Sequence, residues 1–222
     1  MMKSALVIGA SGGIGSALSQ QLRQHSVVIT TLSRSVDRFD LTDPDSVSRG
    51  LGNLNGPFDM ILIATGALEV NGAEPEKTIK SVSAPAMMEQ FALNAVGPAL
   101  VLGHAHKLLP RGRQCVVAVL SARVGSIGDN RLGGWISYRA AKAALNQIVR
   151  TSAIELARTH PQSICVALHP GTVRTSFTRK YAGRHPTVAP EEAAKNLLGV
   201  IDRLTPAQTG GFFDWKGETV PW

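Results

Sequence analysis

The segment Gly9-Ala10-Ser11-Gly12-Gly13-Ile14-Gly15 follows the apolar run Ser4–Ile8 and precedes a helical run over residues 16–24. Glycines permit a tight turn from strand to helix, and the free N–H groups and dipole of a helix N-terminus favour an anion such as a pyrophosphate. A glycine-rich string alone can be a purely structural turn. Its position between the first strand and the first helix favours a dinucleotide-binding turn. The residues expected in that turn are Gly9, Ser11, Gly12, Gly13, Ile14 and Gly15.

Short apolar runs alternate with helix-length segments along the rest of the chain, which is the pattern of βα units and a parallel sheet. Strands are expected at residues 4–8, 27–32, 60–64, 115–120, 163–168 and 211–215. Helices are expected at residues 13–24, 43–50, 85–109, 137–159 and 190–204. Such strands are apolar throughout because helices cover both faces of the sheet. We therefore expect an α/β fold, a single-domain Rossmann-like doubly wound parallel sheet over residues 1–222.

Length and composition agree with a globular protein that has one core. The chain has 222 residues, of which 44% are hydrophobic and 18% charged, values typical of globular domains. No apolar run approaches the ~20 residues that a membrane helix needs, and the first ten residues are too short for a secretory signal. We expect a cytoplasmic protein with no membrane partner.

The net charge of +7 raises nucleic-acid binding as an alternative. The basic residues are scattered and form no known nucleic-acid motif, so no nucleic-acid partner is expected. Cys115 and Cys165 each lie within an apolar run and are expected to be reduced core thiols. Metal ligands are not clustered along the chain, and no metal site is expected.

The end of the second strand indicates which dinucleotide binds. An acidic residue there would accept from a ribose 2′-hydroxyl and imply NAD, whereas Ser33 and Arg34 can hold a 2′-phosphate. NADP(H) is therefore expected over NAD(H), with a solvated surface arginine as the alternative. Asp40 and Leu41 come one loop later and are candidates for contact with the adenine, although Asp40 can equally be an ordinary acidic residue before a helix.

Tyr138 and Lys142 open a long helix and are separated by four positions, so both side chains lie on one helix face. Moving a phenol pKa from about 10 to about 7 takes roughly 4 kcal/mol. One ammonium at ~4 Å in an effective dielectric near 20 supplies about that much. Such a pair also arises by chance on helix surfaces, and its neighbours in the sequence decide its meaning.

Those neighbours resemble the short-chain dehydrogenase/reductase family over essentially the whole chain. The matching residues are Gly9, Gly13 and Gly15, Asn94, Ser121, Tyr138 with Lys142, and the run Pro170-Gly171-Thr172-Val173-Arg174-Thr175. More narrowly, the segment from Ser121 to Trp135 and the C-terminal Phe213-Asp214-Trp215 with Pro221-Trp222 are similar to the C-factor-like subgroup.

The resemblance implies hydride exchange between a nicotinamide and a carbonyl or alcohol. It gives Tyr138 the role of general acid and base, and it implies that Lys142 lowers the Tyr138 pKa and binds the nicotinamide ribose. Asn94 would support a water that relays protons, and Ser121 would hydrogen-bond the substrate oxygen. It further implies cofactor contacts at Ala64, Thr65, Gly66, Asn94, Pro170, Gly171, Val173 and Thr175. It also implies a homodimer or homotetramer whose subunits contact one another through helices 85–109 and 137–159.

Three positions depart from the family pattern. Ile8 stands in place of the threonine before the first glycine, and Ile63-Ala64-Thr65-Gly66 replaces Asn-Asn-Ala-Gly. Ala122 occupies the position usually taken by the catalytic serine. Ser121 is the preferred replacement, Ser126 is a second candidate, and the absence of any serine role is the third alternative.

Residues 174–189 are expected to form a flap over the small-molecule substrate. Candidate lining residues are Trp135, Phe177, Tyr181 and Trp215, although aromatic residues more often serve packing. Arg123 or Arg131 could attract an anionic substrate or be solvated loop charges. The expected function is an NADP(H)-dependent oxidoreductase, and the alternative is a non-catalytic dinucleotide sensor on the same fold. Neither substrate nor reaction direction is defined by the sequence.

Overall fold

The computed structural model describes residues 2–175, 178, 180 and 186–222. Within them, six strands form one sheet in the order β2-β1-β3-β4-β5-β6, and every neighbouring pair is parallel. The strands are β1 Ser4–Ile8, β2 Val28–Leu32, β3 Met60–Ile63, β4 Cys115–Leu120, β5 Ser163–His169 and β6 Phe212–Asp214. The expected doubly wound parallel sheet is confirmed.

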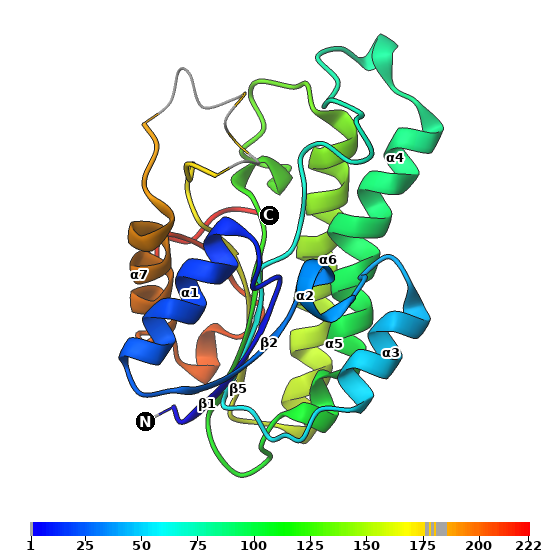
Figure 1. Cartoon of the computed structure of the whole chain (residues 1–222). Coiled ribbons are helices and arrows are strands. Elements are labelled where there is room, and N and C mark those ends of the chain that lie inside the picture. The colour runs from blue at the N-terminus through cyan, green and yellow to red at the C-terminus, as the bar shows by residue number, and fades with distance from the viewer. Residues whose placement is uncertain (1, 176–177, 179, 181–185) are drawn as a thin grey trace.

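Helices cover both faces of the sheet (Figure 1). One face carries α1 Gly13–Gln24 and α7 Pro190–Ile201; the other carries α3 Pro44–Gly52, α4 Ala84–Phe91, α5 Gly97–Leu108 and α6 Ile136–Thr159. A hydrophobic core lies on each face of the sheet. Successive residues of a strand point to opposite faces, so each central strand contributes side chains to both cores. In β1, for example, Leu6 and Ile8 join the core under α5 and α6, whereas Ala5 and Val7 join the core under α1 and α7.

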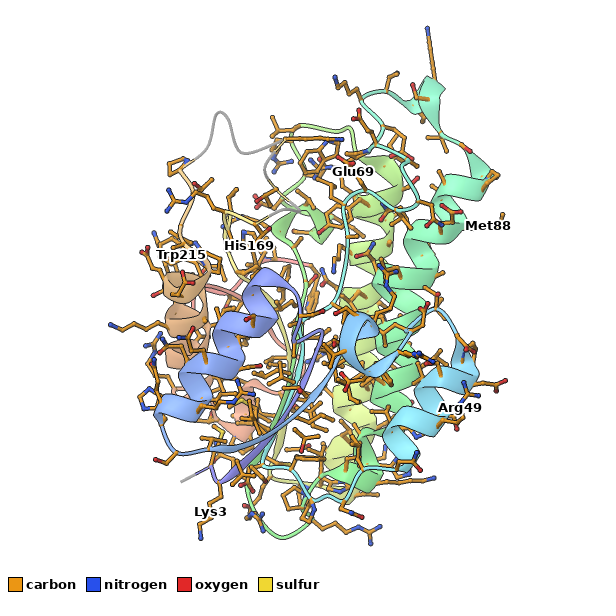
Figure 2. All side chains as sticks on the ribbon, in the orientation of Figure 1. Lys3, Arg49, Glu69, Met88, His169 and Trp215 are labelled. Atoms are coloured by element: carbon orange, nitrogen blue, oxygen red, sulfur yellow. The ribbon has the colours of Figure 1, made fainter. Side chains whose placement is uncertain are left out.

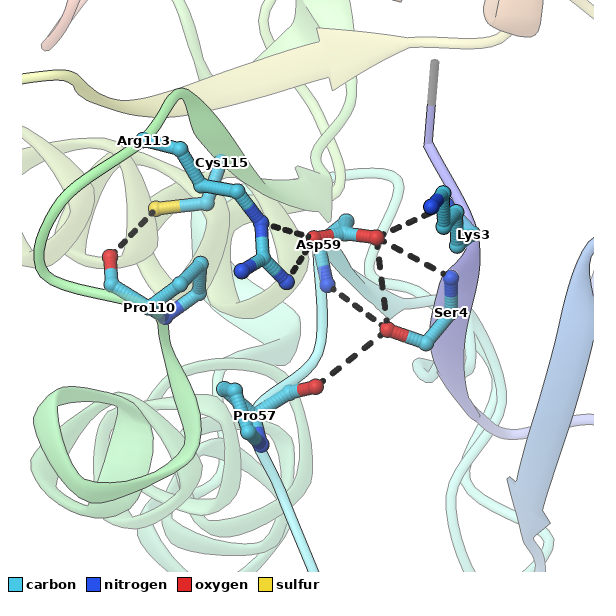
Figure 3. Close-up of polar contacts among 7 residues, drawn as sticks. All are labelled: Lys3, Ser4, Pro57, Asp59, Pro110, Arg113 and Cys115. Carbon is cyan, nitrogen blue, oxygen red and sulfur yellow. Dashed lines mark hydrogen bonds and ion pairs between the residues drawn. The ribbon is translucent and has the colours of Figure 1, made fainter.

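A buried carboxylate fixes the N-terminal ends of three strands (Figure 3). Asp59 Oδ2 accepts from the backbone N–H groups of Lys3 and Ser4 at 2.7 and 3.1 Å, and Asp59 Oδ1 accepts two bonds from the Arg113 guanidinium at 2.8 and 2.7 Å. Burial opposes ionisation of Asp59, but these donors outweigh it and lower the pKa of the carboxyl. This network lies at the end of the sheet opposite the glycine turn.

The expected helix over residues 85–109 is divided in the structure. α4 and α5 are separated by a π-helical turn, Ala92–Val96, which contains Asn94. Such π turns inside helices occur mostly at functional sites. The four-residue helix α2, Arg34–Asp37, was not expected from the sequence. The strands and the other α-helices begin and end within three residues of the expected positions.

No helix among the described residues is long and apolar enough to cross a membrane. The described residues also contain no group of three or more His, Cys, Asp or Glu side chains arranged to hold a metal ion. Cys115 and Cys165 are buried and unpaired with each other.

Candidate active site

The glycine turn needs glycine for backbone reasons. Gly9 has φ of +86°, a conformation that L side chains rarely adopt, and a Cβ there would lie 2.7 Å from the carbonyl oxygen of Ala64. A Cβ on Gly13 would lie 2.7 Å from Cγ2 of Thr175, so the turn and Thr175 are in contact. α1, which is described in full, has no side-chain cap and no acidic residue in its first turn. Its leading N–H groups therefore fit a pyrophosphate.

The segment that follows β3 lies against the glycine turn and reaches α6. Thr65 packs beside Gly9, and its hydroxyl is buried with no hydrogen-bond partner among the described residues. A Cβ on Gly66 would lie 2.8 Å from Asn94 Oδ1 and 3.2 Å from Lys142 Nζ. Backbone, amide and ammonium therefore converge on one point. An orphaned hydroxyl and a surface without Cβ atoms both fit a dinucleotide lying across this edge.

Asn94 is fully buried and holds the loop after β3. Its Oδ1 accepts from Ala67 N at 3.1 Å, and its Nδ2 donates to Ala67 O at 2.9 Å and to Gln90 Oε1 at 2.7 Å. Gln90 in turn donates to Leu68 O at 2.7 Å. Gln90 was not predicted from the sequence, although its position four residues before Asn94 in a helix could have indicated it.

Tyr138 and Lys142 are both buried, and Lys142 Nζ lies 5.8 Å from the centroid of the Tyr138 ring. Lys142 also donates to Leu120 O at 3.1 Å. Burial lowers the pKa of Lys142 to about 7 and raises the pKa of Tyr138 above its usual value. In the protein alone, burial thus opposes the expected lowering of the Tyr138 pKa, because desolvation disfavours the charged form of both groups.

A carboxylate that the sequence did not indicate accepts hydrogen bonds from the first turn of α6. Glu76 is buried, accepts from Ser137 N at 3.2 Å, and accepts a short hydrogen bond from the Ser137 hydroxyl. Ser137 lies directly before Tyr138 in the first turn of α6, where a negative charge is stabilising. Glu76 lies 61 residues earlier in an irregular loop, so no spacing connects it with Tyr138.

Ser121 and Ser126 are both buried and engaged locally. Ser121 Oγ donates to Asn146 Oδ1 at 2.6 Å, and Asn146 Nδ2 donates to Gly125 O at 3.3 Å. Ser126 Oγ accepts from Asp129 N at 3.1 Å. The Ser121 bond is directed toward α6 one turn beyond Lys142, so a role for either serine at the substrate oxygen stays a prediction.

The adenosine end of the expected cofactor site is formed by β2 and α2. Arg34 is exposed at the first position of α2. Ser33 donates from its backbone N–H and its hydroxyl to Asp37 Oδ2 at 2.8 and 3.1 Å. Asp37 was not predicted, and its charge lies next to the group expected to hold a 2′-phosphate. Cofactor contact at Ser33 remains a prediction.

Asp40 and Leu41 follow α2. Asp40 Oδ1 accepts hydrogen bonds from the backbone N–H and from the hydroxyl of Thr42, both at 2.8 Å. These two hydrogen bonds lower the Asp40 pKa. Leu41 is buried against Gly97, where an added Cβ would lie 2.8 Å from Leu41 Cβ. Both residues are therefore engaged with the protein, and their contact with an adenine stays a prediction.

The strand end after β5 lies between the glycine turn and the C-terminal segment. Gly171 has φ of +78°, and a Cβ there would lie 3.0 Å from the Trp215 ring. Val173 is buried and bridges to Val188. Pro170 joins β5 to Gly171. Figure 2 places Glu69, His169 and Trp215 toward one end of the molecule and Lys3 at the other.

The expected flap lies partly outside the described residues, and so do Phe177 and Tyr181. Lys180 is described, and its Nζ forms ion pairs with Glu69 at 3.0 Å and Glu74 at 3.3 Å, both in the loop after β3. Arg123 pairs with Asp129 at 2.5 Å and with buried Asp214 at 3.8 Å. Two carboxylates thus offset its charge, which weakens the expectation that Arg123 attracts an anionic substrate.

The parallel sheet with its glycine turn and buried tyrosine–lysine pair defines a dinucleotide-dependent oxidoreductase. A family model described as enoyl-(acyl carrier protein) reductase matches residues 9–204. The chain belongs to the short-chain dehydrogenase/reductase family and is an NAD(P)-dependent oxidoreductase.

Within the family, the resemblance to C-factor-like proteins is confirmed. C-signal of Myxococcus xanthus is 37% identical over 137 residues, which cover 61% of this chain and 78% of that protein. A 1-hydroxy-2-glutathionyl-2-methyl-3-butene dehydrogenase of Rhodococcus sp. (strain AD45) is 30% identical over 236 residues and covers both chains fully. A short-chain dehydrogenase/reductase structure from Burkholderia multivorans with bound NADP is 25% identical, covers 100% of each chain, and has a TM-score of 0.78.

Proposed function

We propose that the protein is an NADP(H)-dependent reductase or dehydrogenase of a carbonyl–alcohol pair, with Tyr138 as general acid and base. The observation that carries this proposal is the convergence of Lys142 Nζ and Asn94 Oδ1 on Gly66, with Tyr138 one turn before Lys142. A polar cluster so deeply buried, at the carboxyl ends of parallel strands, is the usual location of chemistry in this type of sheet.

A bound nicotinamide dinucleotide supplies the hydride for reduction and accepts it in oxidation. Tyr138 donates its phenolic proton to the substrate oxygen in reduction and takes the proton back in the reverse direction. Lys142, with a pKa near 7, can gain or lose a proton at neutral pH and so replenish Tyr138. Asn94 holds the loop after β3 against α6 and keeps Gly66 close to the ammonium.

Tyr138→Phe tests the catalytic part of this proposal. We expect turnover of aldehydes, ketones or quinones to fall by roughly 10²–10⁴-fold, the usual contribution of a positioned acid or base, while NADPH binding is retained. An active parent whose turnover survives in Tyr138→Phe would refute the assignment of Tyr138. A parent that binds dinucleotide and turns over none of the panel would favour the non-catalytic sensor.

Arg34→Ala tests the choice of NADP(H). Titration of intrinsic tryptophan fluorescence with NADPH and NADH gives both dissociation constants. We expect NADPH to bind more tightly to the parent and to weaken selectively in the variant, because Arg34 is an exposed cation beside the end of β2. Equal weakening of both nucleotides would contradict a role at the 2′-phosphate.

The substrate flap and the oligomeric state are also proposals. Residues 174–189 would cover the substrate within a single domain, supported by the ion pairs of Lys180 with the loop after β3. A homodimer or homotetramer would use the outer faces of α5 and α6. Exposed Ile154 on α6 supports this surface, and light scattering of the purified protein measures the mass.

A further inference from the structure

A polar cavity lies between α1 and β2, next to the glycine turn. Its volume is about 160 Å³, many times the about 10–15 Å³ that one water molecule needs. Five hydroxyl residues and one arginine supply its polar lining: Ser11, Ser16, Ser19, Arg23, Thr31 and Ser33. Ser11 and Ser33, which line the cavity, are also residues expected to contact the proposed cofactor, so the cavity adjoins the proposed cofactor site.

Arg23 is the basic residue in this lining. Ser16, Ser19 and Arg23 occupy one face of α1, and side chains on a helix lean toward its N-terminus, so Arg23 extends back toward the glycine turn. Its side chain has no hydrogen bond or ion pair among the described residues. The Ser19 hydroxyl donates to Gly15 O at 2.8 Å and is therefore already used.

Asp37 makes the opposite side of the cavity unfavourable for an anion. Its carboxylate accepts both hydrogen bonds that Ser33 can donate. A phosphate beside Ser33 would meet this negative charge without a free Ser33 donor. On the α1 side, Arg23 offers a planar guanidinium with several donors, which suits a phosphate group.

We propose that Arg23 is a specificity-determining residue that binds the 2′-phosphate of NADP(H) from α1. The inference rests on the proposed preference for NADP(H) and extends it to a second cation, which lies on α1, whereas Arg34 lies on α2. Arg23 discriminates between the two nucleotides and takes no part in proton transfer.

The test is a fluorescence titration of Arg23→Ala with NADPH and NADH, alongside Arg23→Lys and Arg49→Ala. Arg49 lies on α3 (Figure 2), is exposed, and is absent from the cavity lining, so it controls for net charge. We expect Arg23→Ala to weaken NADPH about tenfold, as loss of one charge-assisted hydrogen bond predicts. NADH binding should be unchanged, Arg23→Lys should retain most of the preference, and Arg49→Ala should resemble the parent.

The outcomes separate the two proposals. If the parent prefers NADPH and Arg23→Ala leaves the ratio unchanged while Arg34→Ala reduces it, the inference fails and the proposed function stands. If the parent binds both nucleotides equally, both the cofactor preference and the role of Arg23 are overturned. Arg23 is exposed, so the variants should fold, and their circular dichroism and melting temperature check this.

Discussion

The nicotinamide end and the adenosine end of the proposed cofactor site hold their charged groups in different ways. At the first, Lys142 is buried, contacts Leu120 O, and has its pKa lowered by desolvation. At the second, Arg23 and Arg34 are exposed beside solvent. In the proposed function, burial therefore governs proton transfer at one end, whereas Coulomb interactions weakened by water govern nucleotide selectivity at the other.

The largest effect is expected from a substitution at the buried nicotinamide end. Lys142→Met should reduce turnover by at least about 10²-fold, because it removes the group that exchanges protons with Tyr138. The measurement is kcat with a substrate that the parent reduces, with NADPH binding measured in parallel. Unchanged turnover with intact folding would contradict the role of Lys142.

The same variant tests the pKa through stability. The native pKa of Lys142 is about 7, and its value in the unfolded chain is 10.5. Between pH 7 and pH 10.5, the Lys142 amine is therefore mostly protonated in the unfolded chain and mostly neutral in the native protein. Stability should therefore rise with pH above 7, by at most about 1.4 kcal/mol per pH unit. Lys142→Met should flatten this rise in denaturant unfolding between pH 7 and 8.5. Burial raises the native pKa of the two cysteine thiols above their unfolded value of 9.0, so the thiols lower stability as the pH approaches 9.0. This contribution is common to the parent and to Lys142→Met, and the difference between the two proteins therefore reports Lys142.

A smaller effect is expected from Glu76, which is proposed to position Tyr138 through Ser137. Glu76→Ala should lower the free energy of unfolding by about 1–3 kcal/mol, because Ser137 loses the buried acceptor of its N–H and hydroxyl. It should also lower kcat about tenfold with little change in KM, since Tyr138 follows Ser137. Glu155→Ala, at an exposed position of α6, the helix that carries Ser137 and Tyr138, is the matched control. A KM effect without a kcat effect would place Glu76 in substrate binding instead.

The smallest effect is expected at the exposed adenosine end, where the Asp37 charge lies beside Ser33. Asp37→Asn should strengthen NADPH binding about two- to threefold, the size expected for an exposed charge, and should leave NADH unchanged or slightly weaker. An asparagine can still accept from Ser33, so the turn should persist. Weaker NADPH binding would show that Asp37 supports the nucleotide through Ser33.

Regular patterns made much of this molecule predictable. All six strands were indicated by short apolar runs, and the i, i+4 relation placed Tyr138 and Lys142 on one face of α6. The π turn at Asn94 escaped detection because the apolar pattern continues across it. Asn94 in this turn bonds to Ala67 in the loop after β3, a contact that no local pattern encodes.

Apart from Gln90, the residues that escaped prediction act across long separations or in very short elements. Glu76 reaches Ser137 from an irregular loop, and Asp37 lies in a helix of four residues. The expected lowering of the Tyr138 pKa considered Coulomb attraction alone. Desolvation, which depends on how completely the surrounding chain encloses the phenol, was absent from that argument and has the larger effect.

The exposure of Arg34 on a four-residue helix has a consequence for how this chain can evolve. Substitutions at exposed positions usually change folding stability by no more than about 0.5 kcal/mol. With Arg34 selecting NADP(H) as proposed, a lineage could therefore exchange one nucleotide for the other through mutations at the end of β2, while its core and α6 remained unchanged. Redesign of nucleotide choice should begin there, where selection for folding constrains the sequence least.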